Sequence, residues 1–316
     1  MKLFIYLKIL SPIYKFLSAY KYFKKITINS LKLNYCYPIK IKTYEHSGQG
    51  VHPSLLYCPQ RNPSFILSFT PYPFSRDIFE NPSVLISSDG INFFEEKPNI
   101  NPLVPASEKD HNNDPEIFIY NDKYFILYLE TLRPEKQNLK LLESSDRINW
   151  KHSLIHTDYL NSDNPDPFIL SPSFIHCMDK DFLFYVILSK NENNIIEYIV
   201  IKENFIPDFE NRKKIKIDLQ AFNPWHISII SDSRFFYMLI SCVESINNKK
   251  NYNLYIARST DITDWNFSKK LLLKNAYRSS GFIQDNYLNI FYSRETMLGA
   301  WEIGICKKNL KEYFSD

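Results

Sequence analysis

The stretch His111-Asn-Asn-Asp-Pro-Glu-Ile-Phe-Ile-Tyr-Asn-Asp-Lys-Tyr-Phe-Ile-Leu-Tyr-Leu-Glu-Thr131 contains a pattern that recurs along this chain. Two apolar runs, residues 117–120 and 124–129, flank the turn-forming pair Asn121-Asp122. Short runs of β-branched and aromatic residues around a two-residue turn of this kind predict a β-hairpin. We therefore start from a hairpin and look for further copies of it.

Four other segments begin in the same way, with a polar or proline-containing opening followed by an apolar run. A second apolar run follows each opening, so each segment predicts another hairpin. The five openings are His52-Pro-Ser-Leu-Leu, Asp114-Pro-Glu-Ile-Phe, Ser171-Pro-Ser-Phe-Ile, Trp225-His-Ile-Ser-Ile and Arg278-Ser-Ser-Gly-Phe.

A second repeated element is a strand that ends in a Ser-Asp turn with an aromatic residue shortly after it. Its clearest copies contain Asp89, Asp146 and Asp261, which are 57 and 115 residues apart. Because 115 is close to twice 57, a copy is expected near residue 203, and a weak one is present at residues 198–205. A last copy spans residues 301–309. Five units of roughly 50–60 residues with about four strands each predict an all-β, five-bladed β-propeller over residues 45–316.

Composition agrees with a β-rich chain in a reducing compartment. Aromatic residues make up 16% of the 316 residues, which favours strands. With only 6 glycines, the turns must use Asn, Asp, Ser and Pro. The 5 cysteines show no CxxC spacing and are odd in number, so we expect free thiols and a cytoplasmic location.

The N-terminal segment, residues 1–44, differs from the rest. It holds nine lysines and no acidic residue, so its net charge is +9. Because the whole chain has a net charge of +3, the remaining residues carry about −6 (+3 minus +9). Lys8 interrupts its apolar run, and we expect neither a signal peptide nor a membrane span. From Ser11-Pro12 onward the pattern predicts a basic amphipathic helix. Such a helix could bind an anionic membrane surface through residues 1–25, at the inner membrane face, or pack on the propeller with its lysines in solvent.

In a propeller the innermost strands line one central channel, so equivalent positions that are far apart in sequence become neighbours. We therefore expect the polar residues of the five openings to meet in one site. The predicted set is His52, Asp114 with Glu116 and the nearby His111, Ser171, His226 and Arg278.

Several short motifs resemble one known group of five-bladed propellers. They are His52-Pro-Ser, Thr70-Pro-Tyr-Pro, Glu80-Asn-Pro-Ser, Asn112-Asn-Asp-Pro, Tyr277-Arg-Ser-Ser and the Ser-Asp-Gly-x-x-aromatic turns. Together with the fivefold repeat, they resemble glycoside hydrolase family 43 and its relatives, and more narrowly propeller proteins associated with bacterial surface polysaccharides. The resemblance covers residues 45–306.

The resemblance implies inverting hydrolysis of a glycosidic bond by three carboxylates, one in each of the first three blades. A water must fit between the base and the sugar in that mechanism. This chain keeps Asp114 in the second blade, but His52 stands at the position of the base and Ser171 at that of the acid. The family chemistry therefore does not transfer directly.

Other residues could replace the missing groups. His52 could act as a base near neutral pH, and Glu80 or Asp166 could supply an acid. Arg278 and Arg294 suit an anionic group of a substrate. Tyr72, Trp225 and Tyr277 could stack on sugar faces, although core packing is the default for any single aromatic residue.

No motif for a nucleotide, a serine nucleophile or a zinc protease occurs, and we expect no cofactor. His111 with Asp114 and Glu116, or His52 with His226, could bind a metal, but their spacing does not require one, and we expect none. The lysines of the N-terminal segment do not support nucleic-acid binding. Two hypotheses follow: an enzyme that hydrolyses or transfers a glycosidic or glycosyl-phosphate linkage of a bacterial surface glycan, with Asp114 central, or a glycan-binding propeller without catalysis.

Overall fold

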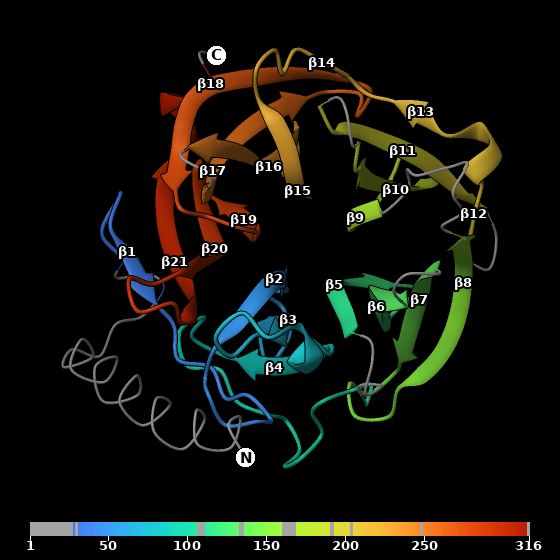
Figure 1. The fold of residues 1–316 in the computed structure, drawn as a ribbon, viewed down its shortest axis with the longest axis vertical. Coiled ribbons are helices and arrows are strands. Elements are labelled where there is room, and N and C mark those ends of the chain that lie inside the picture. The colour runs from blue at the N-terminus through green and yellow to red at the C-terminus, as the bar shows by residue number, and fades with distance from the viewer. Residues whose placement is uncertain are drawn as a thin grey trace.

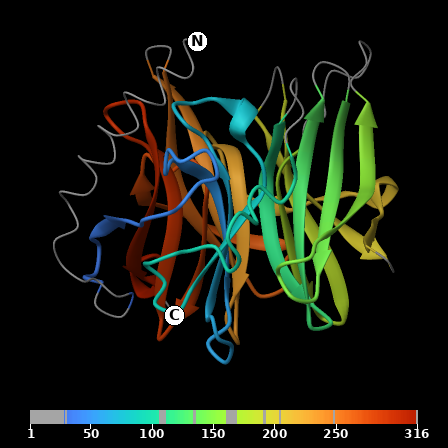
Figure 2. The same cartoon turned by 90° about the horizontal axis from the view of Figure 1, so that it is seen from below.

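The computed structural model describes residue 28 and residues 31–105, 111–132, 136–159, 169–189, 193–202, 205–246 and 249–314. Five sheets, antiparallel except for one short edge strand, surround a central axis, which confirms the predicted all-β five-bladed propeller (Figure 1). Figure 2 shows the same ring of sheets from the side. The expected amphipathic helix, which starts at Ser11, lies outside the described residues.

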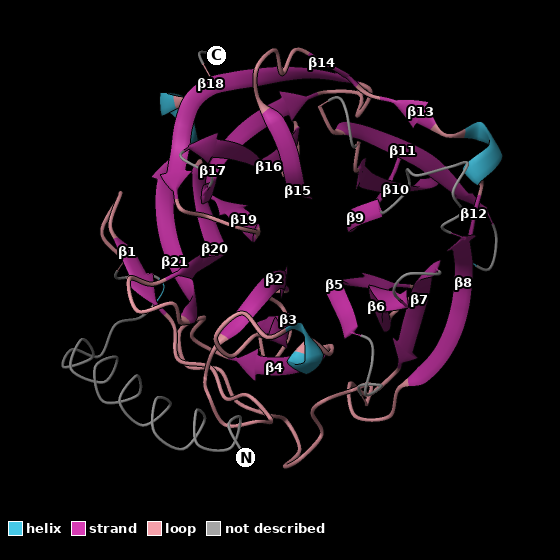
Figure 3. Cartoon of the chain, viewed as in Figure 1, coloured by secondary structure: helices cyan, strands magenta, loops and turns pink. Residues whose placement is uncertain are grey.

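Each blade is one sheet, and its first three strands follow one another outward from the axis in chain order, as the numbering in Figure 3 shows; in blade 5, β1 is the outermost strand. Blade 1 contains β2 (Gly50–Tyr57), β3 (Phe65–Pro71) and β4 (Ser83–Ser87). Blade 2 contains β5 (His111–Tyr120), β6 (Lys123–Leu132), β7 (Lys136–Ser144) and β8 (Lys151–Tyr159). Blade 3 contains β9 (Ile169–Cys177), β10 (Lys180–Ile187), β11 (Ile195–Lys202), β12 (Ile206–Pro207) and β13 (Lys213–Lys214).

Blade 4 contains β15 (Asn223–Ser231), β16 (Phe236–Ile246), β17 (Lys249–Ser259) and β18 (Asp264–Lys274), with β14 (Lys216–Ile217) parallel to β18 at its edge. Blade 5 contains β19 (Ser279–Gln284), β20 (Tyr287–Glu295), β21 (Trp301–Asn309) and β1 (Cys36–Pro38). Three short 3-10 helices complete the described structure: η2 (Asp77–Phe79), η4 (Phe209–Asn211) and η5 (Leu310–Glu312).

The hairpin predicted from residues 111–131 is β5–β6. Asn121 and Asp122 have positive φ angles of 48° and 59°, as a two-residue turn with both central residues left-handed requires. The runs before the Ser-Asp turns are the third strands of their blades, β4, β7 and β17.

The Ser-Asp turns share one hydrogen-bond pattern, which explains their recurrence. Asp146 Oδ1 accepts the backbone N–H groups of Ile148 and Asn149 at 2.9 and 2.8 Å. Asp89 and Asp261 accept the equivalent pairs of N–H groups in blades 1 and 4. A short acceptor side chain that bonds the backbone two and three residues on stabilises a turn in place of a strand.

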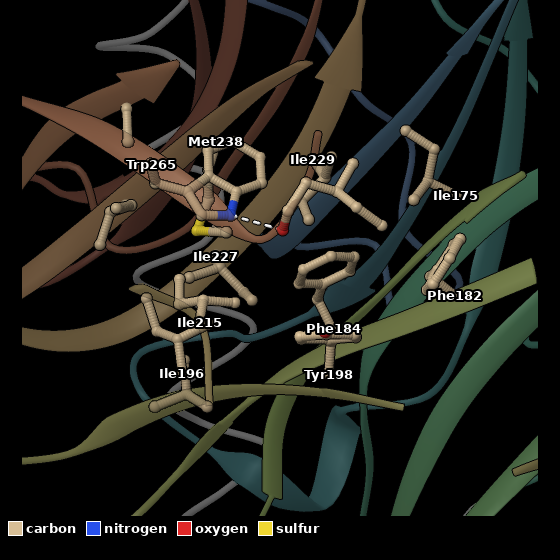
Figure 4. Packing of buried hydrophobic residues seen from close by; sticks show 14 of the residues in the cluster. Ile175, Phe182, Phe184, Ile196, Tyr198, Ile215, Ile227, Ile229, Met238 and Trp265 are labelled. Carbon is tan, nitrogen blue, oxygen red and sulfur yellow. Dashed lines mark hydrogen bonds between the residues drawn. The ribbon is translucent and has the colours of Figure 1, made fainter. Parts of the chain in front are cut away.

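The core lies between neighbouring blades. Figure 4 shows the cluster between blades 3 and 4, where Phe184 and Tyr198 pack towards Met238 and Trp265. Because each sheet presents alternate side chains to the blade before it and the blade after it, apolar residues on both faces of every blade become buried.

The propeller ring closes by joining strands from both parts of the chain. Strand β1 pairs antiparallel with β21, so residues 36–38, part of the basic N-terminal segment, form the outer strand of blade 5. Among the described residues, no helix is long and apolar enough to cross a membrane.

Candidate active site at the propeller axis

Three of the predicted openings share an unusual backbone. His52, Asp114 and Ser171 each precede a proline, and their φ angles are 53°, 52° and 52°. The register of the innermost strand shifts at each of these positions, as it does in a β-bulge. A left-handed backbone is strained for a residue with a side chain, and such strain collects at functional sites. The bulges therefore mark one structurally equivalent position in blades 1, 2 and 3.

Asp114 lies at the centre of the site and is fully buried. Arg278 Nη1 of blade 5 donates to its Oδ1 at 2.6 Å, and the Ser171 N–H donates to its Oδ2 at 2.9 Å. Burial alone would raise the pKa of Asp114, but the charge of Arg278, with smaller effects of His52 and His226, holds that pKa well below its usual range. Asp114 is therefore a permanent carboxylate at neutral pH.

Two histidines face the same carboxylate oxygen. His52 Nε2 lies 3.5 Å and His226 Nδ1 lies 3.7 Å from Asp114 Oδ1. Burial lowers the pKa of His52 to about 4 and that of His226 well below its ordinary value, so both imidazoles are neutral at pH 7. Both rings also contact a hydroxyl group: His52 Nδ1 lies 3.0 Å from Thr70 Oγ1, and His226 Nδ1 lies 2.6 Å from Ser171 Oγ.

These three residues could hold a cation. His52, Asp114 and His226 each offer one ligand atom, and the atoms lie within 4.8 Å of one another. In the described part of the chain, His226 Nε2 is a buried nitrogen with no hydrogen-bond partner, as a ligand nitrogen awaiting a metal would be. Two neutral imidazoles and one carboxylate form a donor set that suits divalent transition metals. Arg278 on the same carboxylate oxygen opposes a second positive charge, so the residues fit best a cation that receives its main donation from the imidazoles.

Glu116 lies beside Arg278 and is held by both neighbouring blades. Ser54 and Ser173 donate their hydroxyl groups to its two carboxyl oxygens at 2.9 and 3.0 Å, and Arg278 Nη2 lies 3.6 Å away. Burial raises the pKa of Glu116 to about 7, although Arg278 and the two serines act in the opposite direction.

The same positions form hydrogen bonds from blade to blade. The N–H of Ile117 donates to Ser54 Oγ, and that of Ile229 donates to Ser173 Oγ. The N–H of Leu55 donates to Ser280 Oγ in the same way. Glu116 thus occupies the inner-strand position that holds serine in blades 1, 3 and 5. It connects the inner strands of blades 1, 2 and 3 and also lies beside Arg278.

Glu80 and His111 lie at the edge of this cluster. Glu80 follows η2, is 5% exposed, and its Oε2 is 3.9 Å from His52 Nδ1. Its backbone carbonyl accepts the N–H of Asn112 at 2.9 Å, which ties its loop to blade 2. His111 opens β5, is buried, and its charge acts on His52. Both residues are therefore in a position to act with His52.

Aromatic side chains from blades 4 and 5 contact the rings of His52 and His226. The Tyr277 ring lies 4.5 Å from that of His226 and 5.5 Å from that of His52. Burial, together with the negative charges of Glu80 and Asp114, raises the pKa of Tyr277 well above its ordinary value, so its hydroxyl stays protonated. Further ring contacts connect Tyr277 with Trp225, Tyr252, Trp301 and Tyr72, and we call these five residues the aromatic wall.

One predicted residue among those that the structure describes, Arg294, does not join the site. Arg294 donates from Nε to Glu302 Oε1 at 2.8 Å, and its charge acts on Cys36 of β1 at the outer part of blade 5. Its guanidinium is used within blade 5, because Glu302 lies directly opposite it on β21. Asp166 lies outside the described residues.

Sequence reasoning missed Thr70, Tyr252 and Trp301. Each has a weak signal in the sequence: Thr70 opens the Thr-Pro-Tyr-Pro motif, Tyr252 lies near the start of a third strand, and Trp301 begins one. The two aromatic residues belong to third strands, which do not line the axis, and they connect to the site through their ring contacts with Tyr277.

Comparisons with known proteins find similar structures but no similar sequence family. No protein-family model matches this sequence, and no curated protein matches it. The structure is similar to an N-acetylgalactosamine deacetylase from F. plautii in complex with blood group B trisaccharide, with a TM-score of 0.76, 16% identity, and coverage of 90% of this chain and 98% of that one.

Glycosidases with the same architecture are also similar. An exo-1,5-alpha-L-arabinanase from a bovine ruminal metagenomic library has a TM-score of 0.57 and 12% identity, over 82% of this chain and 92% of that one. The GH43_1 enzyme from Xanthomonas citri complexed with xylotriose has a TM-score of 0.60 and 9% identity, over 87% and 90%. This chain therefore has the five-bladed β-propeller fold seen in structures of glycoside hydrolase family 43 and in the F. plautii deacetylase.

Proposed function

We propose that this chain is a carbohydrate-active hydrolase that removes an acyl group from an amino sugar, with its reaction centre at the axial site. The observation that carries the proposal is the set His52, Asp114 and His226, which meets where the family resemblance implies three separate carboxylates. With His52 and Ser171 at the positions of the base and the acid, inverting cleavage of a glycosidic bond lacks two of its three groups. A site with two neutral imidazoles beside a carboxylate suits hydrolysis of an acyl bond better.

The chemistry of the set supports this choice. A divalent cation bound by His52, Asp114 and His226 would polarise an acyl carbonyl and make a bound water more acidic. The hydroxyl groups of Thr70 and Ser171 hydrogen-bond to the Nδ1 atoms of His52 and His226 and orient the two imidazoles, as hydrogen-bond partners of ligand histidines do in metal sites.

Protons can be moved by groups next to this set. Glu80, 3.9 Å from His52, is in a position to take a proton from the attacking water and return it to the departing amine. The Tyr277 hydroxyl keeps its proton and can donate a hydrogen bond to the oxygen that becomes negative. Water adds to the acyl carbon, the C–N bond breaks, and a carboxylic acid and a free amine leave.

The aromatic wall supports a sugar as the substrate. Tyr277 and Trp225 lie on one side of the axial site, and flat apolar faces of this kind stack on sugar rings. The similar deacetylase from F. plautii was solved with a trisaccharide, which also favours an N-acylated glycan. From the resemblance to propellers associated with bacterial surface polysaccharides, we propose such a polysaccharide, or its precursor, as the source of that glycan.

A second candidate is cleavage of a glycosidic or glycosyl-phosphate linkage in the same glycan. It is favoured by three buried carboxyl groups near the axis, those of Asp114, Glu80 and Glu116. The arabinanase and the xylotriose complex share the fold, which is compatible with this candidate.

The test offers the purified chain N-acetylated oligosaccharides and measures released acetate and new reducing ends in parallel. We expect acetate release that falls at least about 100-fold in Asp114→Asn and in His226→Gln. A chelator should lower the rate, and a divalent metal should restore it. His176→Gln is the matched control, because His176 is exposed on blade 3 and pairs with Asp181, and it should leave the rate unchanged.

The outcomes separate the candidates. New reducing ends without acetate would replace the deacylase with the glycosidase. Glycan binding without either product would leave a binding module. Acetate release that Asp114→Asn does not reduce would remove the axial site from the reaction.

A further inference from the structure

The ends of the described chain bring two cysteines together at the seam of the propeller ring. Cys36 on β1 is the register partner of Cys306 on β21. They are 270 residues apart in the sequence, so only closure of the ring makes them neighbours. Residues directly opposite each other in a sheet point to the same face, so the two thiols face each other.

The register places this pair where cross-strand side chains are closest. The N–H of Ile39 donates to the carbonyl of Ile303 at 2.9 Å, which makes 39 and 303 a hydrogen-bonded pair. Pair types alternate along an antiparallel ladder, so Cys36 and Cys306, three positions away, form a non-hydrogen-bonded pair. Such pairs bring the α-carbons to about 4.5 Å, within the range of about 4.4–6.8 Å that a disulfide spans.

Contacts around the pair agree with this geometry. The two thiols hydrogen-bond to each other, and the Tyr292 hydroxyl bonds to Cys36. Tyr292 reaches them because Gly304 lies opposite it, where a β-carbon would come within 3.0 Å of the Tyr292 ring. No other residue type at 304 would leave this room without a shift of the ring.

The two thiols differ in the way that an attacking and a resolving cysteine do. Cys36 is exposed and Cys306 is buried. The hydrogen bond from Cys306 lowers the pKa of Cys36 to about 6, with help from the charges of Lys308 and Arg294, although burial acts against it. Cys36 is thus an accessible thiolate, the form that reacts with a disulfide.

We propose that Cys36 and Cys306 form a reversible disulfide that locks the seam between β1 and β21, with a low-molecular-weight disulfide as the oxidant. The Cys36 thiolate attacks one sulfur of the oxidant and releases one thiolate from it. Cys306 then loses its proton, attacks the Cys36 sulfur and releases the second thiolate. Two protein thiols become one disulfide, and the oxidant is reduced to two thiols.

The experiment treats the purified full chain with oxidised glutathione, alkylates the remaining thiols, and maps the disulfide by mass spectrometry. Thermal unfolding is followed in the oxidised and the dithiothreitol-reduced protein. We expect a Cys36–Cys306 linked peptide, and a Tm higher in the oxidised form by on the order of 5–10 °C, because the crosslink restrains a very long loop.

Two variants make the result specific. Cys36→Ser replaces an exposed side chain, so it should fold, and it should abolish both the linked peptide and the Tm shift. Cys58→Ser, a partly buried cysteine of blade 1, is the matched control and should keep both. A stable mixed disulfide of glutathione at Cys36, a disulfide that maps elsewhere, or a Tm shift that survives in Cys36→Ser would overturn the proposal.

Discussion

Arg278 forms an ion pair with Asp114. Among the described residues, the other basic groups near Asp114 are His52 and His226, which carry a charge only when protonated. Arg278 is fully buried and reaches from blade 5 to blade 2, where Nη1 bonds Asp114 and Nη2 lies 3.4 Å from the carbonyl of Pro115. Its charge compensates a carboxylate that is fully buried. The pair therefore joins the inner strands of blades 2 and 5 as well as setting the charge of the site.

Arg278→Met should leave Asp114 as a buried anion without compensation. We expect a loss of about 3–5 kcal/mol in the free energy of unfolding at pH 7, measured by urea denaturation. Arg278→Met combined with Asp114→Asn removes both charges and should recover a large part of that loss. A loss in the double variant equal to the sum of the losses in Arg278→Met and Asp114→Asn would show that the two charges are not coupled.

Glu116 makes a separate prediction about pH. Its pKa is about 7 in the folded protein and near its ordinary value when unfolded, so the folded state binds a proton more tightly. The stability of the wild type is then greatest below the unfolded pKa and falls as pH rises from about 4.5 to about 7. Glu116→Gln resembles the protonated form, and its amide can still bond Ser54 and Ser173.

Urea unfolding at pH 5 and pH 8 checks this. The wild type should lose on the order of 2–4 kcal/mol more than Glu116→Gln between these two pH values. Asp122→Asn, a change at an exposed turn of blade 2, is the control for a general effect of charge. If the wild type and Glu116→Gln respond equally to pH, Glu116 is not the titrating group.

Among the elements, the Ser-Asp turns recur at the same place in the blades that carry them, at the end of the third strand. In blade 1, Ser87 Oγ accepts the N–H of Gly90, and Asp89 Oδ1 accepts those of Ile91 and Asn92. The hydrogen bonds from backbone N–H groups hold the pKa of Asp89 low, although burial acts to raise it. Each blade that carries this turn thus ends its third strand in the same way, without needing a glycine at every bend.

Asp89→Ala removes the acceptor of two backbone N–H groups. We expect a loss of about 1–2 kcal/mol in the free energy of unfolding, because those donors lose a partner in a half-buried turn. Asp89→Asn keeps one side-chain oxygen and should recover more than half of the loss. The check is urea unfolding at pH 7, and an Asn variant as unstable as the Ala variant would mean that charge, not the acceptor, stabilises the turn.

At the scale of the molecule, the fold could be predicted because it is periodic. A hairpin such as β5–β6 is local, and its turn chemistry at Asn121-Asp122 is readable directly. Five copies at a steady spacing then leave a closed ring as the arrangement that buries both faces of every sheet. Equivalence of the openings also predicted that His52, Asp114 and Arg278 would meet.

The remaining features depend on partners that no local pattern specifies. Arg294 was expected to bind an anion, but its cross-strand partner is Glu302, which depends on the register of β20 and β21. The position of Trp301 in the aromatic wall depends on a hydrogen bond of its indole to Ser75, in another blade. The first contact follows from strand register and the second from the closed ring, and neither follows from the sequence around the residue.

Closure of the ring by β1 is the least local of these features and gives the last prediction. A chain that begins at residue 40 lacks β1 and Ile39, which is 5% exposed in the core between blades 5 and 1. Burial of one such side chain contributes about 1.5–3 kcal/mol, and β21 would also become an open sheet edge. We therefore expect a loss of at least about 2 kcal/mol in the free energy of unfolding and self-association visible by light scattering. A chain that begins at residue 28 keeps β1 and is the control. Equal unfolding midpoints, with both chains monomeric by light scattering, would mean that blade 5 is complete with its three C-terminal strands alone.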